Sequence, residues 1–486
     1  MRPLRSALIA CCFLVLVLVG GRAQSTAPPT PPTDDELAKR VDGVIERQMQ
    51  GRHIPGLSLA VVRDGKVIKA QGYGLANVEN SVSANPETAY LLASMTKQFT
   101  AMSILMLAED GKLSIDDPIS KYLNDPPDVW KDITIRELLG HTAGLKDRFE
   151  EDTLNGDKWH LAYSTDQLYQ AARSRPLDFA PGATWQYSDQ GYFLLGVIIE
   201  RVSGMSYRDF LKKRIFDPLG VNASTTIRLR EIVPHMASGY ALQGETWIHN
   251  RRDIDFGMTS HFGMISTVQD LVKWDLSLRD HKLLKQTSYD LMWTPVNLKD
   301  GSRAVGQAGP YGFGWFLDKF RGHRVVFHGG STGTCIFRLP DDGLTVIVLT
   351  NLEMLSGGDA GAIARRIAAV YVPGIRWVEL RNDTDPDPKL TTRLRQELDN
   401  YANGTFDLSL YAPDLGSQVK KQAGALKPTY SAVGKVEEFS FCESETDGPD
   451  RLVYYKIKFA NMPAPIYMKY TLDTHGLLAA SQSSMQ

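Results

Sequence analysis

The sequence predicts an α+β protein made of two folded parts of unequal size. The chain has 486 residues, 43% hydrophobic and 23% charged, which is long enough for two domains or more. Strand and helix patterns are mixed along the first 372 residues. After an Asp/Pro-rich stretch the order changes to helices followed by a run of strands, which is typical of a small α+β domain.

The start of the chain has the three parts of a secretory signal. Arg2 and Arg5 give a positive end, Leu8 to Val19 form an apolar stretch, and Gly21-Arg22-Ala23 offers small residues for cleavage, so residues 1–24 are the expected signal peptide. An uncleaved membrane anchor is the alternative, but the apolar run is shorter than the roughly 20 residues that a span requires. We expect an exported protein, periplasmic or extracellular, with no integral membrane span after cleavage.

A Pro/Thr-rich tether is expected over residues 25–36, and the first folded domain over residues 37–372. The domain should open with an amphipathic helix from Leu37 to Gln48. Two strands follow, Leu57 to Val62 and Lys66 to Gly72, joined in a hairpin by an Asp-Gly turn. Further helices are predicted at Ile133–Leu139, Tyr192–Val202, Val268–Leu278 and Ala360–Tyr371, and strands at Tyr311–Trp315, Val325–Phe327, Ile336–Phe337 and Leu344–Leu349.

The stretch from Ala93 to Lys97 contains the candidate nucleophile. It leads into the apolar run Phe99 to Leu107, whose spacing predicts a helix buried on most of its surface. Ser94 and Lys97 are three residues apart and share one helix face. Unpaired N–H groups at the helix start would stabilise negative charge on a reacting oxygen, and a desolvated lysine beside it could act as a base. This is the chemistry of an activated serine.

The Ser-x-x-Lys pattern does not establish a catalytic site by itself. The same spacing recurs at Ser417 and Lys420, and a lone match is usually a solvated helix face. A second base, an oxyanion hole and a pocket have to come from other parts of the chain.

Three further stretches could supply them. His141, in His-Thr-Ala-Gly-Leu, is either a catalytic base or a histidine that pins a helix end by hydrogen bonds. Tyr187-Ser188-Asp189 can place a phenol and an acceptor in one cleft, or can form an ordinary surface turn. The glycines of His328-Gly329-Gly330-Ser331 allow close approach, and a free N–H facing Ser94 would complete an oxyanion hole.

The chain has no zinc-type Cys/His spacing and no phosphate-binding glycine loop, so we expect neither metal nor cofactor. Its formal net charge is −2, which gives a nucleic-acid partner no electrostatic support. The sequence does not predict an oligomeric state.

In order, Ser94-x-x-Lys97, His141 to Leu145, Tyr187 to Asp189, and His328 to Gly330 resemble the motifs of the class C β-lactamase and penicillin-binding-protein-like serine hydrolases. The resemblance runs from about residue 37 to residue 372. It implies a serine β-lactamase-like fold, in which a helical subdomain lies beside an antiparallel sheet flanked by helices, with the site between them.

The resemblance also implies roles for individual residues. Ser94 would be the acylated nucleophile, and Lys97 and Tyr187 would share proton transfer. The backbone N–H groups of Ser94 and Ser331 would hold the oxyanion, and water would then release the acyl group. The substrate-binding residues would be Asp189, His328, Gly329 and Gly330.

Two residues depart from the β-lactamase pattern. Asp189 stands where the second motif normally ends in Asn, and a carboxylate facing Lys97 would favour the ammonium and weaken that lysine as a base. His328 stands where β-lactamases usually carry a Lys, so a cation for the β-lactam carboxylate is missing. We therefore predict an esterase, amidase or D-peptidase-like hydrolase of a small-molecule or peptide-like acyl substrate, rather than an efficient β-lactamase. The alternative is a catalytically weak or inactive binding or regulatory protein on the same scaffold.

The C-terminal part is predicted as a linker, residues 373–392, and a small α+β accessory domain, residues 393–486. Its elements are helices at Leu390–Tyr401 and within Pro413–Val433, and a strand meander at Val436–Phe441, Leu452–Phe459, Ile466–Leu472 and Leu477–Ala480. Cys335 and Cys442 fall in different predicted domains and are expected as buried free thiols. The sequence does not predict a role for this accessory domain.

Overall fold

The structure is a computed structural model that describes residues 32–146, 162–228, 230–250, 255–306, 309–377, 380–421, 423–462 and 464–483. The predicted signal peptide, residues 1–24, lies outside the described residues. None of the helices in the described ranges combines the length and the apolarity needed to cross a bilayer.

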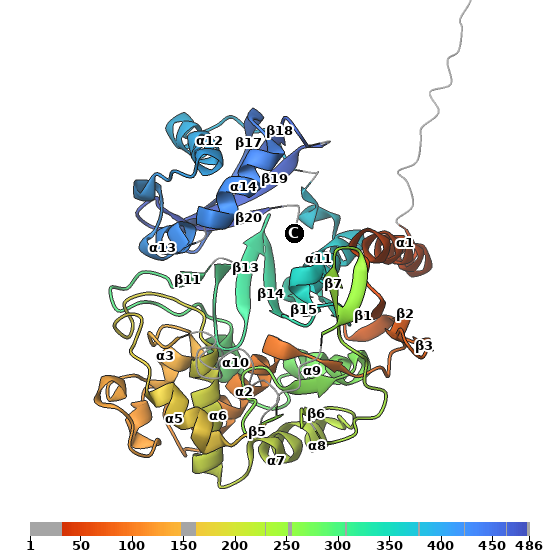
Figure 1. The fold of residues 1–486 in the computed structure, drawn as a ribbon, viewed down its shortest axis with the longest axis vertical. Helices are drawn as coiled ribbons and strands as arrows, with labels where there is room; N and C mark the ends of the chain where they lie inside the picture. Colours follow the sequence, from red (N-terminus) through yellow and green to blue (C-terminus); the bar gives the residue numbers. More distant parts are fainter. Residues whose placement is uncertain are drawn as a thin grey trace, which may run out of the picture.

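A seven-stranded antiparallel sheet forms the centre of the larger domain (Figure 1), in the order β13-β14-β15-β16-β1-β2-β3. β16 pairs with β1, so the first hairpin and the last strands of this domain share one sheet. The predicted hairpin turn is present, because Asp64 and Gly65 both have positive φ, 49° and 76°. The strands are β1 (Gly56–Arg63), β2 (Lys66–Asn77), β3 (Val82–Ser83), β13 (Phe316–Phe320), β14 (His323–Gly330), β15 (Thr334–Leu339) and β16 (Leu344–Thr350).

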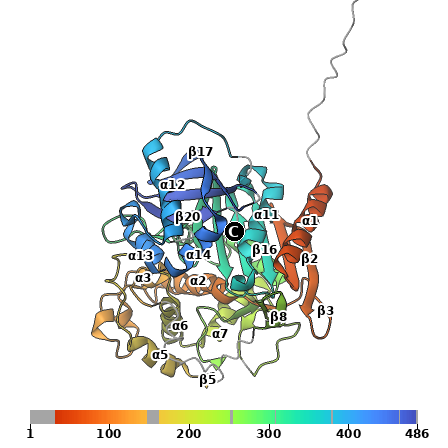
Figure 2. The ribbon, with the colours of Figure 1, turned by 45° about the horizontal axis from the view of Figure 1, so that its top comes forward.

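Both faces of this sheet are covered. Leu59 and Val61 of β1 point into a core shared with α1 (Asp34–Arg52) and α11 (Ala360–Tyr371). Ala60 and Val62 alternate with them and point into the core of the helical subdomain. Figure 2 shows α1, β2 and β3 together on one side of the molecule, opposite α12 and α13.

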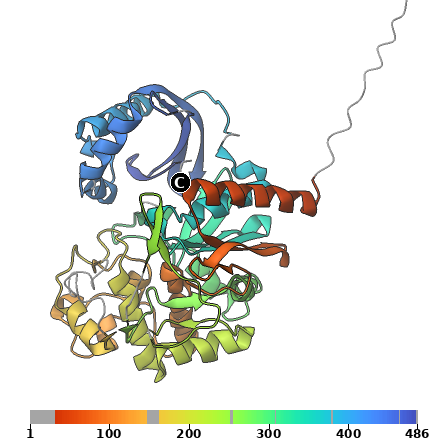
Figure 3. The same cartoon turned by 45° about the vertical axis from the view of Figure 1, so that its right-hand side comes forward.

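The helical subdomain lies on the other side of the sheet from α1 (Figure 3). α2 (Thr96–Glu109) passes through its core and is buried at every residue from Thr96 to Leu107, as the apolar run predicted. The other helices are α3 (Ile135–Leu139), α5 (Thr165–Arg173), α6 (Asp189–Ser203), α7 (Tyr207–Leu211), a π-helical turn (Lys212–Phe216), α8 (Asp217–Leu219), α9 (Val268–Arg279) and α10 (Gln286–Met292). Short strands complete the domain: β4 (Tyr90–Leu91), β5 (Ala162–Tyr163), β6 (Thr225–Thr226), β7 (Tyr240–Gln243), β8 (Thr246–His249), β9 (Asp255–Phe256), β10 (Met264–Ser266), β11 (Val305–Gly306) and β12 (Gly309–Pro310).

The C-terminal domain is a four-stranded antiparallel meander with three helices, and it packs beside β13 at the edge of the larger sheet. There the ring of Phe320 meets that of Tyr454 edge-on, with centroids 5.3 Å apart. The elements are α12 (Pro388–Asn403), α13 (Pro413–Lys421), α14 (Ala423–Val433), β17 (Val436–Asp447), β18 (Asp450–Phe459), β19 (Ile466–Leu472) and β20 (Leu478–Ser483). The predicted fold class is therefore confirmed, including the strand-rich extra domain.

Three helices begin earlier than the residue pattern indicated. α6 starts at Asp189 instead of Tyr192, because the Ser188 hydroxyl caps it. α1 starts at Asp34, within the expected tether, because Thr33 and Glu36 form a capping box that satisfies the first free N–H groups. α12 starts at Pro388, within the expected linker, because Asp387 caps it and proline suits the first helical position.

The strand predicted at Tyr311–Trp315 is wrong. The chain turns there, with Gly314 at φ 78°, and β13 begins only at Phe316. A side chain at Gly314 would place its Cβ 2.8 Å from the carbonyl oxygen of Lys97, so the glycine lets this turn lie against the start of α2.

Cys335 and Cys442 are buried free thiols, as predicted. Burial raises the pKa of the Cys442 thiol to about 11.

Candidate active site

Ser94 lies in a 3₁₀ turn, η1 (Ala93–Met95), that runs directly into α2. Ala93 has φ 46°, a left-handed conformation that residues other than glycine rarely adopt. The Thr96 hydroxyl holds this turn by donating to the Ala93 carbonyl at 2.6 Å, and it accepts from the Met264 N–H at 3.0 Å. Strained backbone of this kind is concentrated at functional sites.

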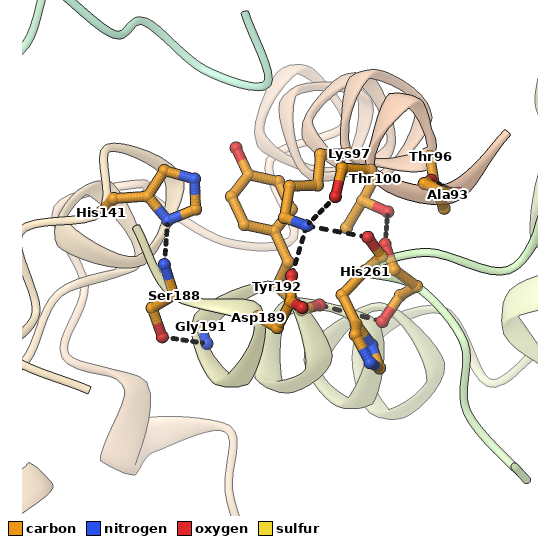
Figure 4. Close-up of polar contacts among 12 residues, drawn as sticks. Ala93, Thr96, Lys97, Thr100, His141, Ser188, Asp189, Gly191, Tyr192 and His261 are labelled. Atoms are coloured by element: carbon orange, nitrogen blue, oxygen red, sulfur yellow. Dashed lines mark hydrogen bonds and ion pairs between the residues drawn. The ribbon is translucent and has the colours of Figure 1, made fainter. Parts of the chain in front are cut away.

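Lys97 is completely buried, with 0% of its side chain exposed, and its amine donates three hydrogen bonds. The acceptors are Asp189 Oδ1 at 2.6 Å, the His261 carbonyl at 2.8 Å and Ser94 Oγ at 3.4 Å. Figure 4 shows the amine reaching from α2 to Asp189 on α6. An ammonium has three N–H donors and no acceptor, so this geometry uses all of its hydrogen-bonding capacity. Asp189 therefore faces Lys97, the condition under which the carboxylate restrains the base.

Tyr187 reaches the same point from the loop before α6. The amine of Lys97 lies 4.7 Å from the centroid of the Tyr187 ring and 5.6 Å from that of Tyr192. The rings of Tyr187 and His328 are 6.4 Å apart. Three sequence-distant motifs thus converge beside Ser94.

His141 holds the Tyr187–Asp189 segment in place. Its Nδ1 accepts from the Ser188 N–H at 3.1 Å, and its carbonyl accepts from the Gln186 N–H at 3.0 Å. Its ring lies 4.4 Å from that of Tyr187. Burial, followed by the charge of Lys97, lowers the pKa of His141 well below its usual range. These contacts favour a structural role, in which His141 holds the start of α6 by hydrogen bonds, over the role of a catalytic base.

The start of α6 places Asp189. The Ser188 hydroxyl accepts from the Gly191 N–H at 3.1 Å and donates to the Lys146 carbonyl at 2.7 Å, which caps the helix. Asp189 is the first helical residue, where the positive end of the helix dipole stabilises a carboxylate. Its side chain is 20% exposed, so it faces both the buried amine and the solvent side of the site.

His328 is a buried neutral imidazole. Its Nδ1 lies 2.8 Å from the Gly329 carbonyl, which can only accept, so Nδ1 carries the proton and Nε2 accepts from the Tyr311 hydroxyl at 3.0 Å. Burial lowers the pKa of His328 to about 3, and the charge of Lys97 acts in the same direction. No cation is therefore supplied at this position near neutral pH.

The end of β14 lies against the backbone that precedes Ser94. A Cβ added at Gly330 would be 2.1 Å from the Leu92 carbonyl oxygen, so only glycine permits this approach. The Thr334 hydroxyl also donates to the Leu92 carbonyl, at 2.9 Å. Ser331 follows directly, and its backbone N–H as the second oxyanion donor remains a prediction.

The second Ser-x-x-Lys match lies away from this site: Ser417 and Lys420 are on α13, which packs with β20 in the C-terminal domain. Two partners in the site, the carbonyl of His261 and the hydroxyl of Tyr311, are not predicted from the sequence. A backbone acceptor has no residue-type signal. The aromatic residues next to Tyr311 favour a strand, whereas the glycines there are the sequence signal for the turn that the structure shows.

A serine and a buried lysine at a helix start, a tyrosine beside the amine and a glycine-rich strand end are brought together on a β-lactamase-like fold. Residues 41–370 match the sequence profile of the Beta-lactamase family. The chain belongs to this family, which confirms the resemblance.

Curated relatives match about two thirds of the chain. The chain is 32% identical over 333 residues to protein flp of Staphylococcus aureus (strain MW2), covering 66% of this chain and 64% of that protein. It is 32% identical over 307 residues to penicillin-binding protein 4* of Bacillus subtilis (strain 168), covering 60% of this chain and 66% of that one. The chain thus spans just under two thirds of these relatives' lengths.

Solved structures share the fold. The octameric penicillin-binding protein homologue from Pyrococcus abyssi has a TM-score of 0.61 at 24% identity, covering 90% of this chain and 96% of that one. The penicillin-binding protein from Bacillus halodurans has a TM-score of 0.56 at 26% identity, covering 66% of this chain and 98% of that one. The broader coverage of the first extends the fold likeness into the C-terminal domain.

Proposed function

We propose that this protein hydrolyses neutral esters and amides of small-molecule or peptide-like acyl groups through an acyl-enzyme on Ser94, and that it is a poor β-lactamase. The observation that carries the proposal is the buried Lys97 amine, which contacts Ser94 Oγ and Asp189 at once. We further propose that residues 37–372 form the catalytic unit and that the signal-like residues 1–24 direct its export.

In the proposed reaction, Tyr187 acts as a phenolate: Ser94 Oγ attacks the acyl carbon while its proton moves to the phenolate oxygen. In wild type Lys97 assists as an ammonium, because its three N–H groups are already donated and its charge near the Tyr187 ring stabilises the phenolate. Without the Asp189 carboxylate, the amine itself could take the serine proton, which is the faster route. The backbone N–H groups of Ser94 and Ser331 hold the oxyanion. Tyr187 then gives the proton to the leaving group, and water repeats the sequence to release the acid.

The charges around the site support a neutral substrate. The Asp189 carboxylate neutralises Lys97, and the neutral His328 offers no cation, so an anionic β-lactam carboxylate finds repulsion instead of a partner. The fold hosts related chemistry: EstCE1, a hydrolase with promiscuous acyltransferase activity, has a TM-score of 0.61 at 24% identity, and D-amino acid amidase from Ochrobactrum anthropi has 0.60 at 22%.

A second candidate is a binding or regulatory protein with disabled chemistry. The Lys97–Asp189 pair favours it, because a lysine held as an ammonium cannot accept the serine proton.

A substrate panel tests the proposal. Wild type and Ser94→Ala are compared on p-nitrophenyl esters, D-amino acid amides, D-dipeptides and benzylpenicillin. We expect kcat/KM for the best neutral ester or amide to exceed that for benzylpenicillin by at least about tenfold, the effect of one lost charge contact worth about 1.4 kcal/mol. Ser94→Ala should abolish turnover. Faster turnover of penicillin overturns the substrate class, and no turnover of any substrate leaves the binding role.

A further inference from the structure

One segment of the catalytic domain contacts two aromatic residues next to the active site, Tyr311 and Trp185. We name residues 296–306 the wall segment. Its Val296 N–H donates to the Tyr311 carbonyl at 3.1 Å, and Tyr311 in turn hydrogen-bonds His328. At its other end Gly306 lies against Trp185, where an added Cβ would come within 2.4 Å of the indole ring. The wall segment therefore supports two aromatic residues of the site.

Those aromatic residues adjoin the reacting groups. The Trp185 ring lies 6.5 Å from that of Tyr187 and 5.9 Å from that of His141. Tyr187 also stacks on Phe316, with centroids 6.4 Å apart and an interplanar angle of 6°. A displacement of the wall segment would tilt this aromatic surface and the hydrogen-bond partner of His328.

The C-terminal domain contacts the wall segment through Arg303 and Val305. One guanidinium nitrogen of Arg303, Nη1, donates to Asp450 Oδ2, to Asp447 Oδ2 and to the Asp447 carbonyl, each at 3.0 Å. Both aspartates flank the β17–β18 turn. Asp450 is only 2% exposed, so it depends on this counter-charge: burial raises its pKa, and the guanidinium opposes the shift. Val305 packs on Ala479 and Ala480 of β20.

We infer that the C-terminal domain sets the position of the aromatic wall through Arg303, and thereby determines how well the enzyme holds substrates with bulky apolar or aromatic groups. Arg303 is a positioning residue, because it acts through the wall segment and not on the substrate. For its activity readout this inference rests on the proposed hydrolase function.

The same interface provides a matched control. Arg321 also makes an interdomain ion pair, Nε to Glu443 Oε1 at 2.9 Å, but it lies in the β13–β14 turn. The strand from His323 to His328 spans five residues, roughly 16 Å at about 3.3 Å per residue, so this contact is remote from the site. Arg321 has φ 49°, and Arg321→Asn removes the charge with a side chain that tolerates this conformation.

The experiment uses the full chain in five forms: wild type, Arg303→Ala, Arg303→Lys, Asp450→Asn and Arg321→Asn. Asp450→Asn keeps the side-chain shape and serves as the second variant should Arg303→Ala fold poorly. Amide hydrogen exchange of peptides covering the wall segment is measured by mass spectrometry. In parallel, kcat/KM is measured for a p-nitrophenyl ester with a bulky aromatic acyl group and for p-nitrophenyl acetate.

We expect faster exchange in the wall segment for Arg303→Ala and Asp450→Asn, and wild-type exchange there for Arg321→Asn. We also expect kcat/KM for the bulky ester to fall by about tenfold to a hundredfold relative to the acetate in Arg303→Ala and Asp450→Asn but not in Arg321→Asn, the range that an ångström-scale misplacement produces. Arg303→Lys should recover part of both losses, because a single nitrogen makes all three contacts.

Unchanged exchange in Arg303→Ala and Asp450→Asn, or equal effects of Arg321→Asn, would overturn the inference. Hydrogen exchange needs no catalysis, so an inactive wild type refutes the proposed hydrolase function while the exchange comparison still decides the role of Arg303.

Discussion

Replacing Asp189 by Asn tests the most unusual feature of the site, the carboxylate on Lys97. The two charges are 2.6 Å apart, which at an effective dielectric constant of 20 corresponds to an attraction of about 6 kcal/mol. Burying an ammonium costs several kcal/mol, so the wild-type pair offsets that cost. A hydrogen bond from the amine to an amide oxygen contributes only about 1.5 to 3 kcal/mol, which no longer offsets it. The ammonium of Lys97 should therefore be less well stabilised in Asp189→Asn, so the amine is less restrained.

We expect Asp189→Asn to acylate faster than wild type with a neutral p-nitrophenyl ester at pH 7, by about tenfold if 1.4 kcal/mol of the restraint is released. The pre-steady-state burst of p-nitrophenol, followed by stopped flow, measures this step. Asp189→Ala is the matched control. It removes the acceptor as well as the charge, and it should lower the free energy of unfolding in urea by about 3 kcal/mol because the buried ammonium loses its partner.

An acylation rate for Asp189→Asn at or below that of wild type would refute the reasoning. It would mean that the carboxylate takes part in moving the proton instead of restraining the amine.

Three further changes probe the rest of the site. His328→Gln should make the free energy of unfolding less sensitive to acid. The pKa of His328 is about 3 in the folded protein and near 6.5 in the unfolded chain, so the wild-type free energy of unfolding falls below about pH 6.5 by up to about 1.4 kcal/mol per pH unit. Urea titrations at pH 7 and pH 5 should show a smaller decrease in the variant than in wild type. Gly330→Ala should lower kcat at least about a hundredfold, because the added Cβ would lie 2.1 Å from the Leu92 carbonyl oxygen. Gly329→Ala, whose nearest contact would be 3.5 Å, should keep kcat within a few-fold of wild type. Equal kcat values in the two variants would contradict the close packing of β14 against the backbone before Ser94. His141→Ala should lower kcat by about tenfold or more while His141→Asn, which can keep an acceptor for the Ser188 N–H and tolerates φ 61°, retains most activity; equal loss in both would indicate a role as a base.

Much of the site was predictable because its motifs are local. Ser94 and Lys97 share a helix face through their spacing alone, and the buried apolar run behind them specifies α2. The hairpin turn at Asp64 and Gly65 and the helix α11 were equally visible, since turn residues and apolar periods act over a few positions.

The misses have non-local causes. The His261 carbonyl reaches Lys97 from a segment 164 positions away, and a backbone oxygen carries no residue type. The aromatic residues around Gly314 favour a strand, whereas the path of this loop is set by its contact with the Lys97 carbonyl. The helices that start at Asp34, Asp189 and Pro388 begin before their apolar periods do, because capping residues extend helices beyond those periods.

Labelling with a fluorophosphonate tests the nucleophile most directly. The reagent should add its phosphonyl group to wild type, with loss of fluoride, and peptide mapping should place the adduct on Ser94. The mass increase should vanish in Ser94→Ala, although this variant still contains Ser417, the serine of the second Ser-x-x-Lys match. No adduct on wild type, or an adduct that persists in Ser94→Ala, would contradict the proposed chemistry.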